Sequence, residues 1–340
     1  MINPTQAAGF LIGAVLFTAV FHGGCAAAVA GPIAGPSATA AGLEGNPAAA
    51  ERGGQGNPSA IFVQAAAPVV FPPATKPPPN VPRGRVYLFR GALGPIFSRG
   101  MDRLTERLEH AGVTADVYEF TICRLIADMA IREYRKDPAP IILIGHSMGG
   151  YCAVIFAEML QAENIPASLV VTIDPAHVTH EVPLNVERFI NIFLSKSVLG
   201  GGDVKPSPGY QGHYASYDLS QHEEVSHINI DKMDLVHEQL IAKVVQLATT
   251  PSQAEGEPLA LRYVVPPDVA IELWDSGMPV FARPGDTLQT IAALYHVPLW
   301  SLTQINKGPD SRPLVPGERV TVPRHLVPLA EVSGPPLAPR

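Results

Sequence analysis

The feature that most constrains the fold of this 340-residue chain is a short apolar run that leads into a serine between two glycines. Residues 141–144 read Ile-Ile-Leu-Ile, and Gly-His-Ser-Met-Gly occupies positions 145–149. Four consecutive apolar residues predict a strand buried on both faces, which is typical of the centre of a parallel sheet. From Tyr151 to about Leu160 the apolar spacing predicts a helix. Ser147 therefore lies on a tight turn at the sheet edge.

This turn also favours a nucleophilic role for Ser147. A serine held on a strained turn needs neighbours without bulky side chains, and Gly145 and Gly149 meet that need. The N-terminus of the following helix aims backbone N–H groups at the serine, where they can stabilise an oxyanion.

A strand–helix alternation surrounds this motif and predicts the domain at residues 84–250. The expected strands cover residues 85–89, 115–120, 141–144, 168–174, 189–194 and 214–219, and the last helix covers 234–247. Such alternation indicates an α/β fold with a mostly parallel, doubly wound sheet. Ser147, Asp174 and the glycine loop at 90–95 all follow strands, so they should meet at the carboxyl edge.

On these residues, and on the order Ser, Asp, His, the region from about 85 to 248 resembles the α/β-hydrolases of the lipase, esterase or thioesterase type. The sheet is a reduced version, because the two leading antiparallel strands of that family have no counterpart here. The resemblance implies a serine hydrolase that cleaves an ester or thioester. No large lid insertion is visible, which favours a small, soluble acyl ester as substrate.

The acid of the implied triad is expected at Asp174, which ends a strand and precedes a proline. A carboxylate there would orient the imidazole and stabilise the imidazolium. Asp before Pro is also a common turn signal. Asp203 and Asp218 are the alternatives.

The base is the harder assignment, because several histidines follow Asp174. The family places its histidine after the last strand and before the closing helix, and His222 and His227 both satisfy this. We expect His227, since residues 225–231 resemble the apolar-flanked segment of thioesterase-like members. His237, inside the predicted helix, is the alternative base. His146 is expected to shape the packing of the turn.

The oxyanion hole is expected to use two backbone N–H groups. One belongs to Met148, directly after the serine. The other belongs to Ala92, by resemblance of residues 90–94 to the His-Gly-x-x-Gly loop of lipases, with Arg90 in place of the usual histidine.

The sequence predicts no metal and no cofactor. Cys123 and Cys152 lie on predicted helices and have no His or Cys at ligand spacing. They can pair as a disulfide or remain buried and free. The net charge of −7 with scattered basic residues gives no indication of nucleic-acid binding.

A second module is expected at residues 279–324. A short strand, a Gly-Asp turn, two helices and a second strand can be read from it, and Asp286 or Thr287 caps the first helix. The pattern resembles a LysM domain from end to end, which implies a βααβ fold that binds N-acetylglucosamine-containing glycans such as peptidoglycan. The implied groove places Asp286, Thr287 and Leu288 opposite the stretch from Asn306 to Leu314.

The remaining segments predict export. Residues 1–30 resemble a signal peptide, with an apolar run at 9–21 and the small-residue site Ala28-Val29-Ala30. Cys25 offers an alternative, lipid anchorage. Residues 31–83 are rich in Pro, Ala and Gly and are expected to be a disordered linker. A second linker is expected at 251–278, and a tail at 325–340.

The sequence therefore predicts an exported serine hydrolase held at peptidoglycan, in the periplasm, in the cell envelope or outside the cell. The alternative is a non-catalytic cell-wall binding protein with a hydrolase-like domain.

Overall fold

The structure is a computed structural model that describes residues 82–92, 94, 98–249, 260–306 and 312–326. The expected signal peptide, nearly all of the first linker and most of the tail lie outside these residues. Among the helices described, none is long and apolar enough to span a bilayer.

The main domain is built on a seven-stranded sheet in the order β2-β1-β3-β4-β5-β6-β7, and every neighbouring pair is parallel. The strands are β1 (Arg85–Arg90), β2 (Thr114–Glu119), β3 (Ile141–His146), β4 (Leu169–Ile173), β5 (Arg188–Phe193), β6 (His213–Asp218) and β7 (Ala260–Val264). The apolar run that opens the motif is β3, and every residue of β3 is buried.

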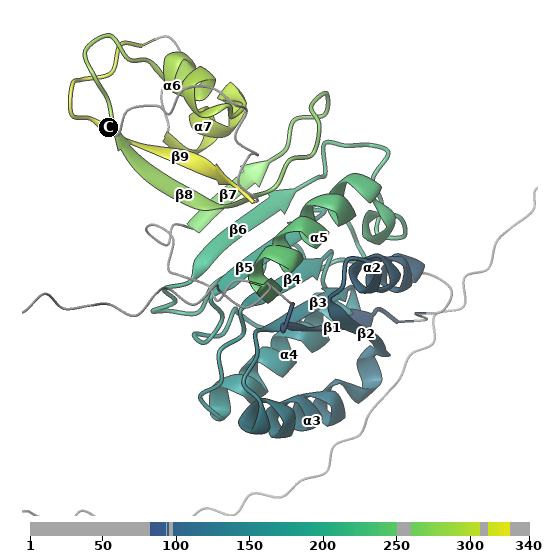
Figure 1. Ribbon diagram of the computed structural model, residues 1–340. Helices are drawn as coiled ribbons and strands as arrows, with labels where there is room; N and C mark the ends of the chain where they lie inside the picture. Colours follow the sequence, from purple (N-terminus) through teal and green to yellow (C-terminus); the bar gives the residue numbers. More distant parts are fainter. Residues whose placement is uncertain (1–81, 93, 95–97, 250–259, 307–311, 327–340) are drawn as a thin grey trace, which may run out of the picture. The chain divides into compact units, whose positions relative to one another are not determined.

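Helices cover both faces of this sheet (Figure 1). Helices α2 (Arg99–His110) and α5 (Asp234–Thr249) share one hydrophobic core with the sheet, and α3 (Cys123–Lys136) and α4 (Met148–Ala162) share the other. Two short 3-10 helices, η1 (Phe120–Ile122) and η2 (Ile230–Lys232), precede α3 and α5. The prediction of a doubly wound α/β sheet is confirmed.

The sheet has one strand more than the sequence predicts. Strand β7 lies within 251–278, where a linker is expected, and pairs with β6 beyond the closing helix. Its burial alternates, with Leu261 and Tyr263 buried and their neighbours exposed, as in an edge strand with one face on the core. Five residues among prolines carry too short a pattern to predict a strand.

The C-terminal module is a small βααβ unit, as predicted. It consists of β8 (Trp274–Phe281), α6 (Leu288–Tyr295), α7 (Leu299–Asn306) and β9 (Arg319–His325), and the two strands pair antiparallel. Its own core includes Leu288, Ile291, Leu302 and Val322. Strand β8 begins several residues earlier than expected, within the second predicted linker.

The first residues of β8 belong to the core of the main sheet. The Trp274 ring lies 5.0 Å from the Tyr263 ring and 6.3 Å from the Tyr217 ring. Asp275 is almost fully buried, and its Oδ2 accepts hydrogen bonds from Arg188, Lys243 and Arg324 at 2.7–3.2 Å.

Candidate active site

Ser147 lies between β3 and α4 in a conformation that few side chains tolerate, with φ of 56° and ψ of −121°. Its glycine neighbours are required by close backbone approach. A Cβ on Gly145 would lie 2.0 Å from the Gly149 carbonyl oxygen, and a Cβ on Gly149 would lie 2.1 Å from that of Phe89. The strain is thus built into the packing of β1, β3 and α4, and it holds the serine at the carboxyl edge of the sheet.

Asp174 follows β4 directly and is fully buried. Its backbone φ is also positive, at 39°. The Leu194 N–H donates to Oδ1 at 3.2 Å, which fixes one side of the carboxylate. Gly200 packs closely against the same carboxylate, since a Cβ there would lie 2.1 Å from Oδ1 and 2.5 Å from Oδ2.

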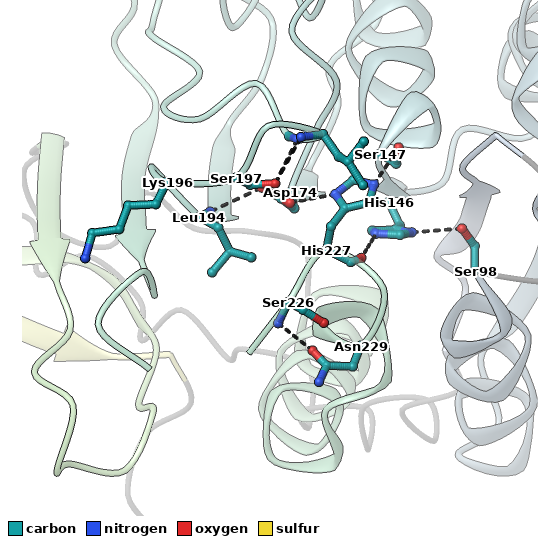
Figure 2. A network of polar contacts seen from close by, with 12 residues as sticks. Ser98, His146, Ser147, Asp174, Leu194, Lys196, Ser197, Ser226, His227 and Asn229 are labelled. Atoms are coloured by element: carbon teal, nitrogen blue, oxygen red, sulfur yellow. Dashed lines mark hydrogen bonds and ion pairs between the residues drawn. The ribbon is translucent and has the colours of Figure 1, made fainter. Parts of the chain in front are cut away.

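His227 connects these two residues (Figure 2). Its Nδ1 lies 2.6 Å from Asp174 Oδ2, and its Nε2 lies 3.2 Å from Ser147 Oγ. An ionised carboxylate only accepts, so the imidazole donates its Nδ1–H to Asp174. The Nε2 lone pair then faces the serine hydroxyl. This is the geometry in which an imidazole can take a proton from serine.

The alternative base, His237, has a different environment. It is fully buried on α5, and its Nε2 donates to the Asp231 carbonyl oxygen at 2.7 Å. Burial lowers its pKa to about 4. The structure therefore brings His227, and not His237, to Ser147. His222 is likewise engaged elsewhere, with Nδ1 3.0 Å from Glu224.

The alternative acids also have other partners. Asp203 accepts from the hydroxyl groups of Tyr214 and Ser216 at 2.6 Å and pairs with Arg262. Asp218 accepts the backbone N–H groups of Ser195 and Ser220 and thereby links the loops after β5 and β6.

Next to the serine, His146 belongs to a chain of hydrogen bonds that the sequence does not reveal. Its Nε2 lies 2.9 Å from the His227 carbonyl oxygen, and its Nδ1 lies 2.8 Å from Ser98 Oγ. The carbonyl only accepts, so Nε2 carries the proton and Nδ1 accepts from Ser98. Ser98 in turn accepts the Gly91 N–H at 3.0 Å. Burial, with a smaller effect of His227, lowers the pKa of His146 to about 3.

This chain ties the end of β3 to two loops, the one between β1 and α2 and the one after β6 (Figure 2). The rings of His146 and His227 lie 4.9 Å apart. The sequence predicts a packing role for His146, and the contacts add that it holds the backbone of His227. Ser98 has no motif that identifies it, because its partners lie 7 and 48 residues away.

The expected oxyanion donors border the serine. Met148 is the first residue of α4, and within the described chain its N–H and that of Ala92 have no acceptor. The loop of Ala92 lies close to Ser147, since a Cβ on Gly91 would be 2.8 Å from the serine Cβ. Arg90 has a structural environment, with ion pairs to Asp102 and Glu119.

Two cysteines, Cys123 on α3 and Cys152 on α4, belong to the core that these helices share with the sheet. Both are buried and free. A hydrogen bond from Cys152 lowers the pKa of the Cys123 thiol to about 7.

In the C-terminal module, Asp286, Thr287 and Leu288 lie at the start of α6 and Leu314 contacts them, whereas Asn306 ends α7. Thr287 caps this helix: its hydroxyl accepts the Thr290 N–H at 3.1 Å, and Thr290 Oγ1 accepts the Thr287 N–H at 2.9 Å. The Asp286 carboxylate accepts the Arg283 N–H, and its carbonyl accepts the Leu314 N–H at 2.8 Å. This last hydrogen bond joins the segment at 286–288 to Leu314, the two stretches that the sequence places opposite each other.

The side chains of Leu288 and Leu314 are buried in the module core. Asn306 is fully engaged: its side chain donates to Leu302 and Thr321 carbonyl oxygens and accepts the Thr321 N–H at 2.7 Å. The side chains of these three residues are therefore engaged within the module. Residues 307–311, part of the expected wall, lie outside the described chain.

Comparisons with known proteins identify the module. A family model described as LysM domain matches residues 282–323. No curated protein has a significantly similar sequence.

Two solved structures are similar to parts of the chain. A candidate hydrolase of the alpha/beta superfamily from Xanthomonas campestris pv. campestris is 18% identical over 37% of this chain and 76% of its own, with a TM-score of 0.26. RedJ, a thioesterase from the prodiginine biosynthetic pathway of Streptomyces coelicolor, is 22% identical over 37% of this chain and 54% of its own, with a TM-score of 0.22. The doubly wound α/β fold of the main domain is given by its own strand order and by the helices on both faces of the sheet.

Proposed function

We propose that this protein is a serine hydrolase that cleaves a carboxylic ester or thioester with Ser147, His227 and Asp174. The observation that carries the proposal is the unbroken series of contacts from Asp174 Oδ2 through the His227 ring to Ser147 Oγ, at 2.6 and 3.2 Å. Burial of the Asp174 carboxylate and the strained backbone of Ser147 each cost free energy of folding. A fold that keeps both beside an imidazole is typical of a functional site.

In the proposed reaction His227 Nε2 takes the proton of Ser147 while Oγ attacks the carbonyl carbon. The N–H groups of Met148 and Ala92 donate hydrogen bonds to the developing oxyanion. The bond to the leaving oxygen or sulfur breaks, and the proton passes from His227 to the leaving atom. Water, activated by the same imidazole, then hydrolyses the acyl-enzyme and restores the serine. Asp174 keeps the imidazole oriented and stabilises its charged form.

A fluorophosphonate probe tests the enzyme proposal, because it reacts only with an activated serine. Wild type should be labelled, Ser147→Ala should not, and Ser207→Ala, a serine outside the site, should be labelled like wild type. Thermal melts of each variant report whether it is folded. Labelling that survives Ser147→Ala, or that never occurs in the wild type, refutes the proposal. The latter result leaves the alternative of a non-catalytic wall-binding protein.

The LysM domain gives the proposal its location: we infer that it holds the enzyme at peptidoglycan or another N-acetylglucosamine-containing glycan. Tethering raises the local concentration of ester groups carried by the wall. The full chain should sediment with purified peptidoglycan and be released by soluble N-acetylglucosamine oligomers. Failure to sediment, or sedimentation that the oligomers do not compete, contradicts this proposal without touching the hydrolase.

Export completes the proposal. Cleavage after Ala30 and lipidation of Cys25 leave different mature N-termini, which intact-mass measurement of the protein from envelope and medium fractions distinguishes. A full-length chain confined to the cytoplasm contradicts both routes.

A further inference from the structure

Beside the proposed base there is a hollow of about 380 Å³ between the loops that follow β5 and β6. Its apolar lining comes from Leu194, Val198 and Leu199 on the first loop and from Val225 and Ile228 on the second. His227 lines it as well. In Figure 2 the side chain of Lys196, another lining residue, points away from His227.

Three large apolar side chains at the rim of this hollow are exposed to solvent. Val198 is 88% exposed, Leu199 56% and Ile228 47%. Single exposed apolar side chains are ordinary, but three that share one concave site indicate a surface that an apolar group covers.

The order of the strands decides which part of a substrate the hollow faces. Along the carboxyl edge, the oxyanion loop follows β1, Ser147 follows β3 and Asp174 follows β4, while the hollow lies beyond them at β5 and β6. With Ala92 as an oxyanion donor, the carbonyl oxygen of a bound ester would face the β1 side. His227, which gives its proton to the leaving atom, is held on the opposite side by Asp174.

We propose that the hollow binds the leaving group, the alcohol or thiol part of the substrate, and selects an apolar one. This inference rests on the proposed function and extends it to a substrate class: esters whose alcohol or thiol carries an alkyl chain. When the carbonyl–oxygen bond breaks, the proton from His227 completes the departing alcohol while it is still in the hollow. The acyl group stays on Ser147.

The hollow therefore acts in acylation only. Deacylation occurs after the alcohol has left, so changes in the hollow leave the rate of deacylation unchanged. This separates a leaving-group site from an acyl site.

Two series of esters, called the alcohol ladder and the acyl ladder, test the proposal with the full chain. One keeps the acyl group as acetyl and lengthens the alcohol from ethyl to hexyl, and the other keeps ethanol and lengthens the acyl group. In wild type, kcat/KM should rise about fourfold for each methylene of the alcohol that becomes buried. Leu199→Ser and Val198→Ser, both at exposed positions, should flatten this rise and keep the slope of the acyl ladder. Leu184→Ser, an exposed leucine before β5, should leave both slopes as in wild type.

Each other outcome overturns the proposal. If the variants flatten the acyl ladder and change the deacylation rate, the hollow binds the acyl group. If they change neither slope, the hollow is no subsite. Both results require turnover that depends on Ser147, so they are distinct from failure of the proposed function, in which such turnover is missing.

Discussion

Acidification from pH 7 to pH 5 should destabilise this fold measurably through one buried side chain, His146. It is about 1% exposed and lies between Ser98 and the His227 backbone, so a second proton on its ring would place a positive charge away from water. Burial first, and the neighbouring His227 second, lower its pKa from 6.5 to about 3.

The sign follows from proton binding. In the unfolded chain the imidazole takes up a proton below pH 6.5, whereas the folded protein does so only near pH 3. Between these two pH values the unfolded state binds more protons than the folded state. The contribution of His146 to the free energy of unfolding is therefore full at neutral pH and is lost as the pH falls. For a folded pKa of 3 or 4 alike, the loss between pH 7 and pH 5 is about 2 kcal/mol.

Other buried groups add to the total change. His213 and His237, whose pKa values burial lowers to about 4, act in the same direction. Asp231 acts in the opposite direction, because burial raises its pKa to about 6 and the folded state then binds the proton first. The contribution of His146 is therefore measured as a difference between two proteins.

Urea unfolding at pH 7 and pH 5 provides this difference. His146→Gln keeps a polar side chain but cannot titrate, so its stability should fall about 2 kcal/mol less than that of wild type over this interval. His177→Gln, at an exposed position after β4, serves as the control and should fall as wild type does. An equal loss of unfolding free energy in wild type and His146→Gln would falsify the assignment of His146 as a neutral ring with two hydrogen bonds.

Three further perturbations have defined outcomes. Asp174→Asn should lower kcat for ester hydrolysis about 10³- to 10⁴-fold with little change in melting temperature, because the imidazole loses its orienting carboxylate; a loss below tenfold contradicts the assignment of the acid. Gly200→Ala places a methyl group 2.1 Å from Asp174 Oδ1 and should reduce kcat at least tenfold while fluorophosphonate labelling slows in parallel; unchanged kinetics would show that this loop yields freely. Asp275→Asn leaves Arg188, Lys243 and Arg324 around a neutral amide and should cost about 3–5 kcal/mol in denaturant unfolding, whereas a loss under 1 kcal/mol means that the cluster is not coupled to folding.

Much of the fold and the position of the serine were accessible from sequence, because both depend on local patterns. Strand β3 is buried on both faces and therefore reads as an uninterrupted apolar run. Asp174 could be anticipated because parallel strands deliver the residues at their ends to one edge. Strand β7 was missed for the converse reason: it is an edge strand, its pairing with β6 is decided by distant residues, and its five positions lie near prolines.

Residue spacing alone does not decide between His227 and His237 as the base, and the contacts of His227 explain why. His227 lies in an irregular loop, so no helix or strand period fixes where its ring points. Its backbone is held by His146, its ring by Asp174, and the turn that follows by Asn229, which accepts the Ser226 N–H at 2.7 Å. Two of these three partners lie more than 50 residues away.

The motif at 145–149 consequently specifies more than the proposed nucleophile. Ser147 provides the hydroxyl, and the residue just before it holds the backbone of His227, the proposed base. Through Ser98 the same imidazole also reaches Gly91, whose backbone packs against the serine on the oxyanion side. One buried, neutral histidine thus couples the distance between base and nucleophile to the position of the oxyanion loop. Because a neutral imidazole donates at one nitrogen and accepts at the other, it can hold both loops at once without a buried charge.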